Sequence, residues 1–182
     1  MSPCHLVTLS QRCAAVELLL LDVDGVLTDG GIVYADDEAE LKKFHVRDGS
    51  GLKVWQLAGK RAAIITGRSS PVVRVRAAEL GIDPVVQGAA DKLAAYRQIL
   101  QATGVRPEQV CMVGDDVPDL PLLRHCGLAV AVADACPEAV AEAHYVTRAA
   151  GGRGAVREAV ELILRCQGHW QRIVGRFRSE TL

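Results

Sequence analysis

The sequence predicts an α/β domain in which a mainly parallel sheet carries helices on both faces. Short apolar runs alternate with segments of helical periodicity along the chain, which is the pattern of such a domain. Some runs, such as Leu18–Leu21, are continuously apolar, as expected of strands that are covered on both faces. The 182 residues, 49% hydrophobic and 24% charged, suffice for one domain with a sizeable core.

Six apolar runs are predicted to be strands, and segments between them are predicted to be helices. The helix boundaries rest on local signals: Pro71 follows Ser70 at one start, and Gly59, Gly81 and Gly104 close other helices. The predicted strands are 17–22, 62–66, 84–87, 110–113, 128–132 and 144–146. The predicted helices are 49–58, 71–80, 90–102, 120–125 and 137–143.

One segment, over about 31–46, does not fit the alternation. Residues 32–35 and 40–46 flank an acidic turn, which indicates a β-hairpin outside the main sheet. Its partly apolar and partly basic faces suit a flap or an interface.

The tail is a second irregular segment. Trp170, Ile173, Val174 and Phe177 fall at helical spacing among several arginines. We expect a helix that docks on its own subunit or on a neighbour, with a short membrane-surface helix as the alternative.

Composition and charge narrow the possible partners. The net charge of -1 gives no long-range field that would attract nucleic acid or an anionic membrane. The longest apolar stretch, 16–21, is too short to span a bilayer, and no secretory signal is recognisable. The six cysteines lack metal-binding or redox spacing, which indicates reduced thiols in a cytoplasmic protein. We therefore expect no nucleic-acid and no membrane partner.

Polar residues gather at four places that follow predicted strands. In an open parallel sheet the carboxyl ends of the strands form the ligand-binding edge, so we expect these residues to meet there. They are Asp22, Asp24 and Gly25 in LDVDGVLTDGG, Thr66, Gly67 and Arg68 in IITGRSS, Lys92 at a helix start, and Asp115, Asp116 and Asp119 in VGDDVPDLP.

These residue types suit phosphoryl transfer to an aspartate. Clustered carboxylates repel one another unless a cation is present, and Mg²⁺ prefers oxygen ligands. Asp22 and Asp115 fit as carboxylate ligands, with a backbone carbonyl near Asp24 completing the protein set. Asp22 would then be the nucleophile that forms an aspartyl-phosphate, while Lys92 and Thr66 neutralise charge on the transferring oxygens.

Asp24 is the predicted general acid and base. It lies two residues beyond Asp22, which places both carboxylates on one face of an extended chain. From there it could protonate the leaving alcohol and later activate the attacking water. Gly25 allows the backbone to turn sharply and approach the phosphate.

Each element alone also has a structural explanation. An Asp-x-Asp pair is common after a strand, Thr66 could cap a helix, and Lys92 could be a solvated lysine. Asp115 and Asp116 could form a turn or an N-cap pair. All four elements occur in this order, each where a strand is predicted to end. Their joint occurrence favours the catalytic interpretation.

At these residues the sequence resembles the haloacid dehalogenase superfamily of aspartyl-nucleophile phosphatases. DVDGVLTDGG, IITGR, Lys92 and GDDVPD resemble its four motifs in order. The resemblance implies a Rossmann-like sheet, the cofactor Mg²⁺ and the roles given above, with Asp22, Asp24 and Asp115 as the metal site.

Further stretches are similar to the 3-deoxy-D-manno-octulosonate 8-phosphate phosphatases: VRDGSG at 46–51, VAVADA at 130–135 and YVTRAAGGRGAVRE at 145–158. The likeness covers roughly 16–168, which leaves an N-terminal extension at 1–15 and a tail at 169–182. It implies hydrolysis of that phosphorylated sugar acid in lipopolysaccharide precursor synthesis, without a separate cap domain. It also implies a homotetramer in which the hairpins assemble centrally and a neighbouring subunit helps to close each active site.

The same resemblance implies substrate contacts at Arg68 and at Arg153 in the AGGRG loop. An arginine can grip a carboxylate through two N–H groups, which suits a sugar acid. Gly67, beside Arg68, and Arg47, beside Asp48 in VRDGSG, are further substrate-binding candidates. Arg153 could instead be a loop residue without a ligand, and Arg47 and Asp48 could merely start a helix. The tail after residue 168 is longer than the resemblance leads us to expect.

Three other functions remain open on the sequence. A phosphatase for a nine-carbon sugar acid 9-phosphate would share the fold and the nucleophile. A non-catalytic oligomerisation module would be expected to have lost Asp22, Lys92 or Asp115, all of which are present. A phosphoaspartate receiver would carry its aspartate on a later, inner strand.

Overall fold

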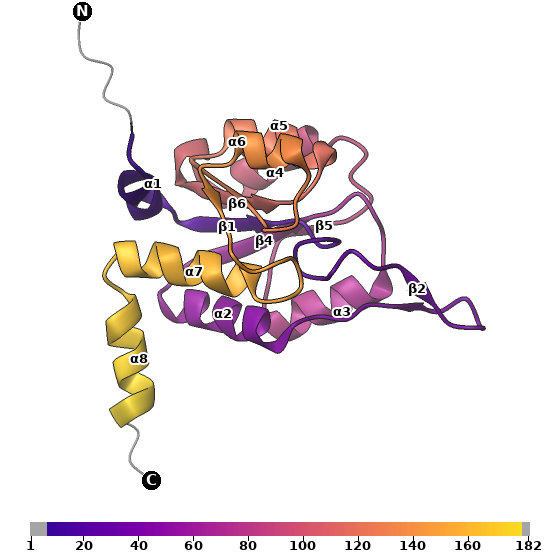
Figure 1. Cartoon of the computed structure of the whole chain (residues 1–182), viewed down its shortest axis with the longest axis horizontal. Helices are drawn as coiled ribbons and strands as arrows, with labels where there is room; N and C mark the ends of the chain where they lie inside the picture. Colours follow the sequence, from indigo (N-terminus) through magenta and orange to yellow (C-terminus); the bar gives the residue numbers. More distant parts are fainter. Residues whose placement is uncertain (1–6, 180–182) are drawn as a thin grey trace, which may run out of the picture.

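A six-stranded, all-parallel sheet forms the centre of the molecule, as the sequence predicts (Figure 1). The structure is a computed structural model and describes residues 7–179. The strands, in their order across the sheet, are β5 (Val85–Val86), β4 (Arg61–Ile65), β1 (Leu18–Leu21), β6 (Val110–Gly114), β7 (Leu128–Ala131) and β8 (Tyr145–Val146).

The central strand β1 is buried on both faces because its four leucines alternate between two helical layers. Leu19 and Leu21 belong to one core, and Leu18 and Leu20 to the other. The first core packs against α2 (Val46–Leu57), α3 (Pro71–Leu80) and α7 (Ala155–Cys166); the second packs against α4 (Lys92–Thr103), α5 (Leu120–His125) and α6 (Pro137–Glu142).

The order of the strands reverses beside β1. The chain runs from β1 to β4 and β5 on one side, and then crosses to β6, β7 and β8 on the other. Leu21 pairs with Ile64 of β4 and with Val113 of β6, so the carboxyl ends of these three strands lie next to one another. This reversal is the position at which open α/β sheets bind ligands.

All five predicted helices are present, with boundaries shifted by up to three residues. The largest shift is at α2, which begins at Val46 because the ring of His45 accepts a hydrogen bond from the Arg47 amide and caps the helix. Two helices were not predicted, α1 (Leu9–Ala15) and α7. Two 3₁₀ turns, η1 (Pro107–Gln109) and η2 (Val117–Asp119), flank β6.

The predicted hairpin is present but its strands are short. β2 (Val33–Tyr34) and β3 (Glu40–Leu41) pair antiparallel as a separate two-stranded sheet that projects from the main body (Figure 1). Apolar side chains on both strands are exposed, with Val33 52% and Tyr34 60% accessible.

The tail forms a helix, α8 (Trp170–Ser179), that docks on its own chain. Trp170 and Ile173 are buried, and the guanidinium groups of Arg157 and Arg165 each lie 5.1 Å from the centre of the Trp170 ring. Much of the apolar face that a membrane-surface helix would need is thus used within the subunit. No helix among residues 7–179 is long and apolar enough to cross a membrane.

Candidate active site

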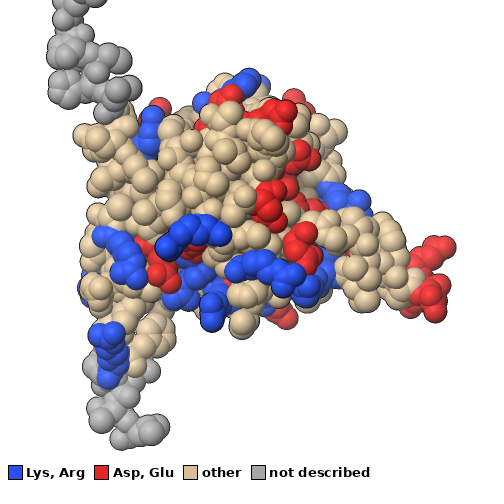
Figure 2. Space-filling model, viewed as in Figure 1, with Lys and Arg blue, Asp and Glu red and all other residues tan. Residues whose placement is uncertain are grey.

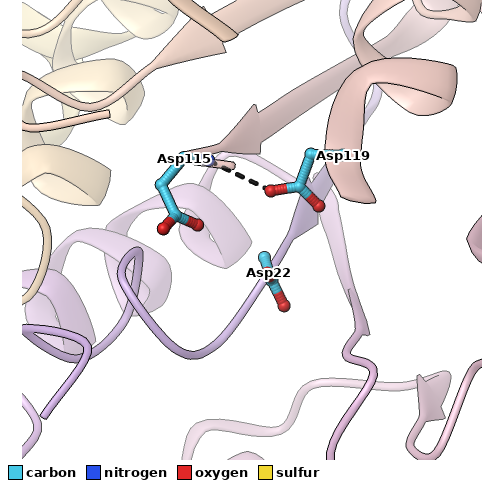
Figure 3. Close-up of side chains that lie close together, drawn as sticks. All are labelled: Asp22, Asp115 and Asp119. Carbon is cyan, nitrogen blue, oxygen red and sulfur yellow. Dashed lines mark hydrogen bonds between the residues drawn. The ribbon is translucent and has the colours of Figure 1, made fainter. Parts of the chain in front are cut away.

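Three carboxylates from two neighbouring strand ends converge at the reversal point (Figure 3). Asp22 follows β1, Asp115 follows β6, and Asp119 closes the η2 turn just beyond. One oxygen of each lies within 4.8 Å of the others. Asp22 and Asp119 are buried, so water screens their mutual repulsion only weakly.

Lys92 places a single positive charge beside this cluster. Its ammonium group donates to Asp22 Oδ2 at 2.8 Å and to Asp119 Oδ1 at 2.7 Å. The lysine starts α4, where the carboxylate of Asp91 accepts a hydrogen bond from the Ala94 amide and caps the helix. One ammonium among three carboxylates leaves the site with an excess of negative charge when all are ionised.

Asp119 has a larger part in the site than the sequence predicted. Its second oxygen accepts a hydrogen bond from the Asp115 amide at 3.0 Å, so it anchors both Lys92 and the turn after β6. A Cβ atom on Gly114 would stand 2.8 Å from the Cβ of Asp119, which only glycine avoids. The signal in the sequence was the final aspartate of GDDVPD, to which no role was assigned.

The buried charges shift one another's pKa. Burial, reinforced by the Asp119 charge and opposed by Lys92, raises the pKa of Asp22 to about 6. Burial and the charges of Asp119 and Asp22 raise the pKa of Asp115 to about 7. Burial disfavours the charge on Lys92, but the carboxylates of Asp22 and Asp119 outweigh it and raise the lysine pKa.

The donor set fits a hard divalent cation. Asp115 Oδ1 is buried and has no hydrogen-bond partner, an arrangement that costs free energy unless a cation or water meets the oxygen. Carboxylate oxygens in this number and spacing suit Mg²⁺, which would also relieve the repulsion that raises both pKa values. Asp22 and Asp115 are thus brought together as the sequence predicted.

Asp24 faces a different neighbour. It lies in the turn beyond β1, and its carboxylate forms an ion pair with Lys42, which follows β3 and has a buried side chain. Its other oxygen is 3.8 Å from Arg68 Nε. The side chain of Asp24 is not in the group of three carboxylates, and its role at the metal stays a prediction. Lys42 was missed because a lysine just after a hairpin strand belongs to no motif.

Thr66, Gly67 and Arg68 follow β4, as predicted. Thr66 is buried, and its hydroxyl oxygen accepts a hydrogen bond from the Arg68 amide at 3.4 Å. The Arg68 guanidinium donates to Glu40 Oε1 at 3.0 Å and to the Tyr34 hydroxyl at 3.2 Å. The hairpin therefore reaches the active-site edge of the sheet.

Arg153 and Arg47 lie on a more peripheral surface. Arg153 is 3.4 Å from Asp29 in the loop after β1, which places its loop beside the Asp22–Asp24 segment. Arg47 and Arg153 both line a groove along α7, rich in arginine, and none of the three clustered carboxylates lines it. Basic side chains gather over this part of the surface in Figure 2. The substrate role of Arg47 stays a prediction.

Comparison with known proteins shows the family to which this chain belongs. The haloacid dehalogenase-like hydrolase family matches residues 82–159. The 3-deoxy-D-manno-octulosonate 8-phosphate phosphatase KdsC of Yersinia pestis is 47% identical over 165 residues, which cover 91% of this chain and 88% of the relative. The chain belongs to the family of 3-deoxy-D-manno-octulosonate 8-phosphate phosphatases.

Solved structures of this phosphatase family share the fold over nearly the whole chain. A probable YrbI family phosphatase from Pseudomonas syringae superposes with a TM-score of 0.92 at 42% identity and covers 94% of this chain and 98% of its own. The family phosphatase from Moraxella catarrhalis, in complex with magnesium, phosphate and 3-deoxy-D-manno-octulosonate (KDO), gives a TM-score of 0.90 at 40% identity, covering 92% and 97%.

The raised carboxylate pKa values predict how stability depends on pH in the metal-free phosphatase. Between about pH 4 and 7 the folded protein holds protons that the unfolded chain has released, so its free energy of unfolding falls as pH rises. Asp115→Asn removes one of these charges. In EDTA at about pH 7.5, urea unfolding should show the variant to be more stable than the wild type and less dependent on pH.

Magnesium should stabilise the wild type at about pH 7.5 and the Asp115→Asn variant much less, at the same protein concentration. A wild type that gains stability between about pH 5 and 7.5 in EDTA, relative to the variant, would contradict the assignment of the raised pKa values.

Proposed function

We propose that this chain is a magnesium-dependent phosphatase that hydrolyses KDO 8-phosphate to KDO and phosphate through a phosphorylated Asp22. The observation that carries the proposal is the cluster of Asp22, Asp115, Asp119 and Lys92 in a chain that matches KDO 8-phosphate phosphatases over most of its length. The Moraxella relative holds magnesium together with phosphate and KDO, which are the two products of this reaction.

The first step is attack of an Asp22 carboxylate oxygen on the phosphorus, which breaks the bond between phosphorus and the sugar oxygen. Lys92 already contacts Asp22 and can neutralise a phosphoryl oxygen, and the hydroxyl of Thr66 can donate to another. When bound by Asp22, Asp115 and the backbone carbonyl at Asp24, Mg²⁺ supplies positive charge that stabilises the transferring phosphoryl group.

Asp24 serves both half-reactions in this proposal. Its protonated carboxyl gives a proton to the leaving sugar alkoxide, and the resulting carboxylate takes one from the water that attacks the phosphoaspartate. That attack breaks the bond between phosphorus and Asp22, releases phosphate and restores both aspartates. Arg68 and Arg153 bind the sugar acid, with the carboxylate as their target and the Gly67 backbone close by.

The hairpin takes the place of a cap domain. We infer that residues 16–168 form the phosphatase unit and that four copies assemble through their hairpins. The exposed apolar side chains of Ile32, Val33, Tyr34 and Leu41 support this assembly, because exposed apolar surface marks contact sites. Since Arg68 already bonds to hairpin residues, a neighbour seated there would border the active site.

We place the reaction in lipopolysaccharide precursor synthesis in the cytoplasm. The likeness to phosphatases named for KDO 8-phosphate supports the pathway. The five cysteines among residues 7–179 are all free, which suits a reducing compartment; Cys4 lies outside the described residues.

Asp22→Asn should abolish phosphate release from KDO 8-phosphate, because an amide is not a competent nucleophile, and it should leave the far-ultraviolet circular dichroism unchanged. Phosphate release with Mg²⁺ is measured across a panel that includes nine-carbon sugar acid 9-phosphates. Asp37→Asn, the same change at the exposed hairpin tip, is the control and should retain activity. Preference for a nine-carbon acid would replace the substrate but keep the mechanism, whereas retained hydrolysis by Asp22→Asn would refute the nucleophile.

Asp24→Asn should slow turnover by about 10²–10⁴-fold, because the asparagine can neither donate the proton nor accept it back. Rapid-quench experiments with a substrate whose phosphate is radioactively labelled measure how fast the phosphoenzyme forms and decays. Near-normal formation and decay would remove Asp24 from both steps.

Val33→Lys should convert the proposed tetramer into smaller species, because it buries a charge in the hairpin contact. Light scattering coupled to gel filtration measures the mass. Leu57→Lys, at an exposed leucine of α2 outside the hairpin, should leave the mass unchanged. A wild type that is monomeric at micromolar concentration would rule out the assembly.

A further inference from the structure

The first turn of α7 has no capping side chain of its own. Gly154 occupies the N-cap position with a φ of +109°, and as a glycine it offers no acceptor to the free amides of the helix. It ends the AGGRG loop, residues 150–154, which carries Arg153. The helix start and the position of Arg153 therefore depend on contacts from elsewhere in the fold.

Asp48 supplies the missing cap from another helix. It is the third residue of α2 and is only 1% exposed. Its Oδ1 accepts a hydrogen bond from the Arg157 amide at 2.8 Å, and its Oδ2 accepts one from the Gly154 amide at 3.2 Å. The negative charge also sits at the positive end of the α7 dipole.

The packing of α2 on α7 is adapted to this contact. A Cβ atom on Gly51 would stand 3.1 Å from the Cα of Arg157, so a glycine at this position permits the close approach of the two helices. Asp48 lies one turn earlier on α2, and the same approach brings its carboxylate to the α7 amides. The carboxylate keeps these hydrogen bonds although burial raises its pKa.

The other end of the loop is seated on the segment that follows the nucleophile. The Gly152 amide donates to the Val26 carbonyl at 2.9 Å. A Cβ on Gly151 would stand 1.7 Å from the Gly25 carbonyl oxygen, and one on Gly152 would stand 2.4 Å from the Thr28 carbonyl carbon. The loop is thus held between the nucleophile segment and Asp48, with Arg153 in its middle.

We propose that Asp48 is a positioning residue that fixes the AGGRG loop and thereby presents Arg153 to the carboxylate of the substrate. The inference rests on the proposed function of Arg153. Asp48 itself touches no reacting atom. By holding the loop, its buried carboxylate would control how tightly the sugar acid binds. Its consequence is confined to substrates that carry the group recognised by Arg153.

Asp48→Asn tests the proposal because the amide keeps the size of the side chain but turns one acceptor into a donor that faces a backbone amide. The KM for KDO 8-phosphate should rise about tenfold, while kcat/KM for p-nitrophenyl phosphate, which has no carboxylate, should stay within about twofold. Arg153→Gln should show the same split. The double variant should be no worse than Arg153→Gln alone, because both changes act through one contact.

Glu161→Gln is the matched control, since it removes a carboxylate that lies on α7 and pairs with Arg157 and Arg165 outside the AGGRG loop. It should leave both substrates unaffected. If Asp48→Asn lowers kcat/KM equally for both substrates, the role of Asp48 is merely structural and the inference is overturned. If Arg153→Gln raises the KM for KDO 8-phosphate and Asp48→Asn does not, the inference is overturned and the proposed function remains intact.

Trypsin gives a readout that does not depend on activity. Cleavage after Arg153, mapped by mass spectrometry under native conditions, should be slow in the wild type and at least about tenfold faster in Asp48→Asn, because the loop end is released. Equal cleavage rates would overturn the inference even if KDO 8-phosphate proved not to be the substrate. If Asp48→Asn fails to fold, Asp48→Ser, which is smaller and keeps one acceptor, takes its place in both measurements.

Discussion

Mutual repulsion among closely spaced carboxylates is the constraint on which the active site depends. Asp22, Asp115 and Asp119 are held close together by the backbone of two strands and a turn, and Lys92 balances only part of their charge. The arrangement costs stability in the absence of a cation, and the raised pKa values of Asp22 and Asp115 express that cost. A divalent metal would reduce this repulsion and would allow an anionic phosphate to approach the carboxylates.

Close backbone contacts surround this charged centre and limit how it can move. The segment after Asp22 is packed by Gly151 and Gly152 from one side, where a Cβ atom would overlap backbone atoms. From the hairpin, Lys42 pairs with Asp24, and Glu40 pairs with Arg68. Elements distant in the sequence thus hold the catalytic edge, and the hairpin is one of them.

Much of the fold and several residues of the site were predictable because their signals are local. Apolar runs and glycine or proline boundaries identify the strands and five of the helices, and the strand ends identify Asp22, Thr66 and Asp115. The periodicity of α7 was also available, since its buried residues recur at intervals of three to four, but the helix was not predicted. The extended strand predicted at 40–46 was wrong beyond Leu41, because residues 42–45 have no regular structure and His45 caps the helix that begins at Val46.

The sequence by itself determined a parallel sheet with an aspartate nucleophile at one strand end and acidic and basic groups at its neighbours. Only the tertiary structure decided which of these groups touch. Lys92 meets Asp119, Lys42 meets Asp24, and Asp48 caps a helix that begins more than a hundred residues later. The physical reason is that strand and helix signals act over a few residues, whereas these contacts depend on how helices and loops pack across the sheet.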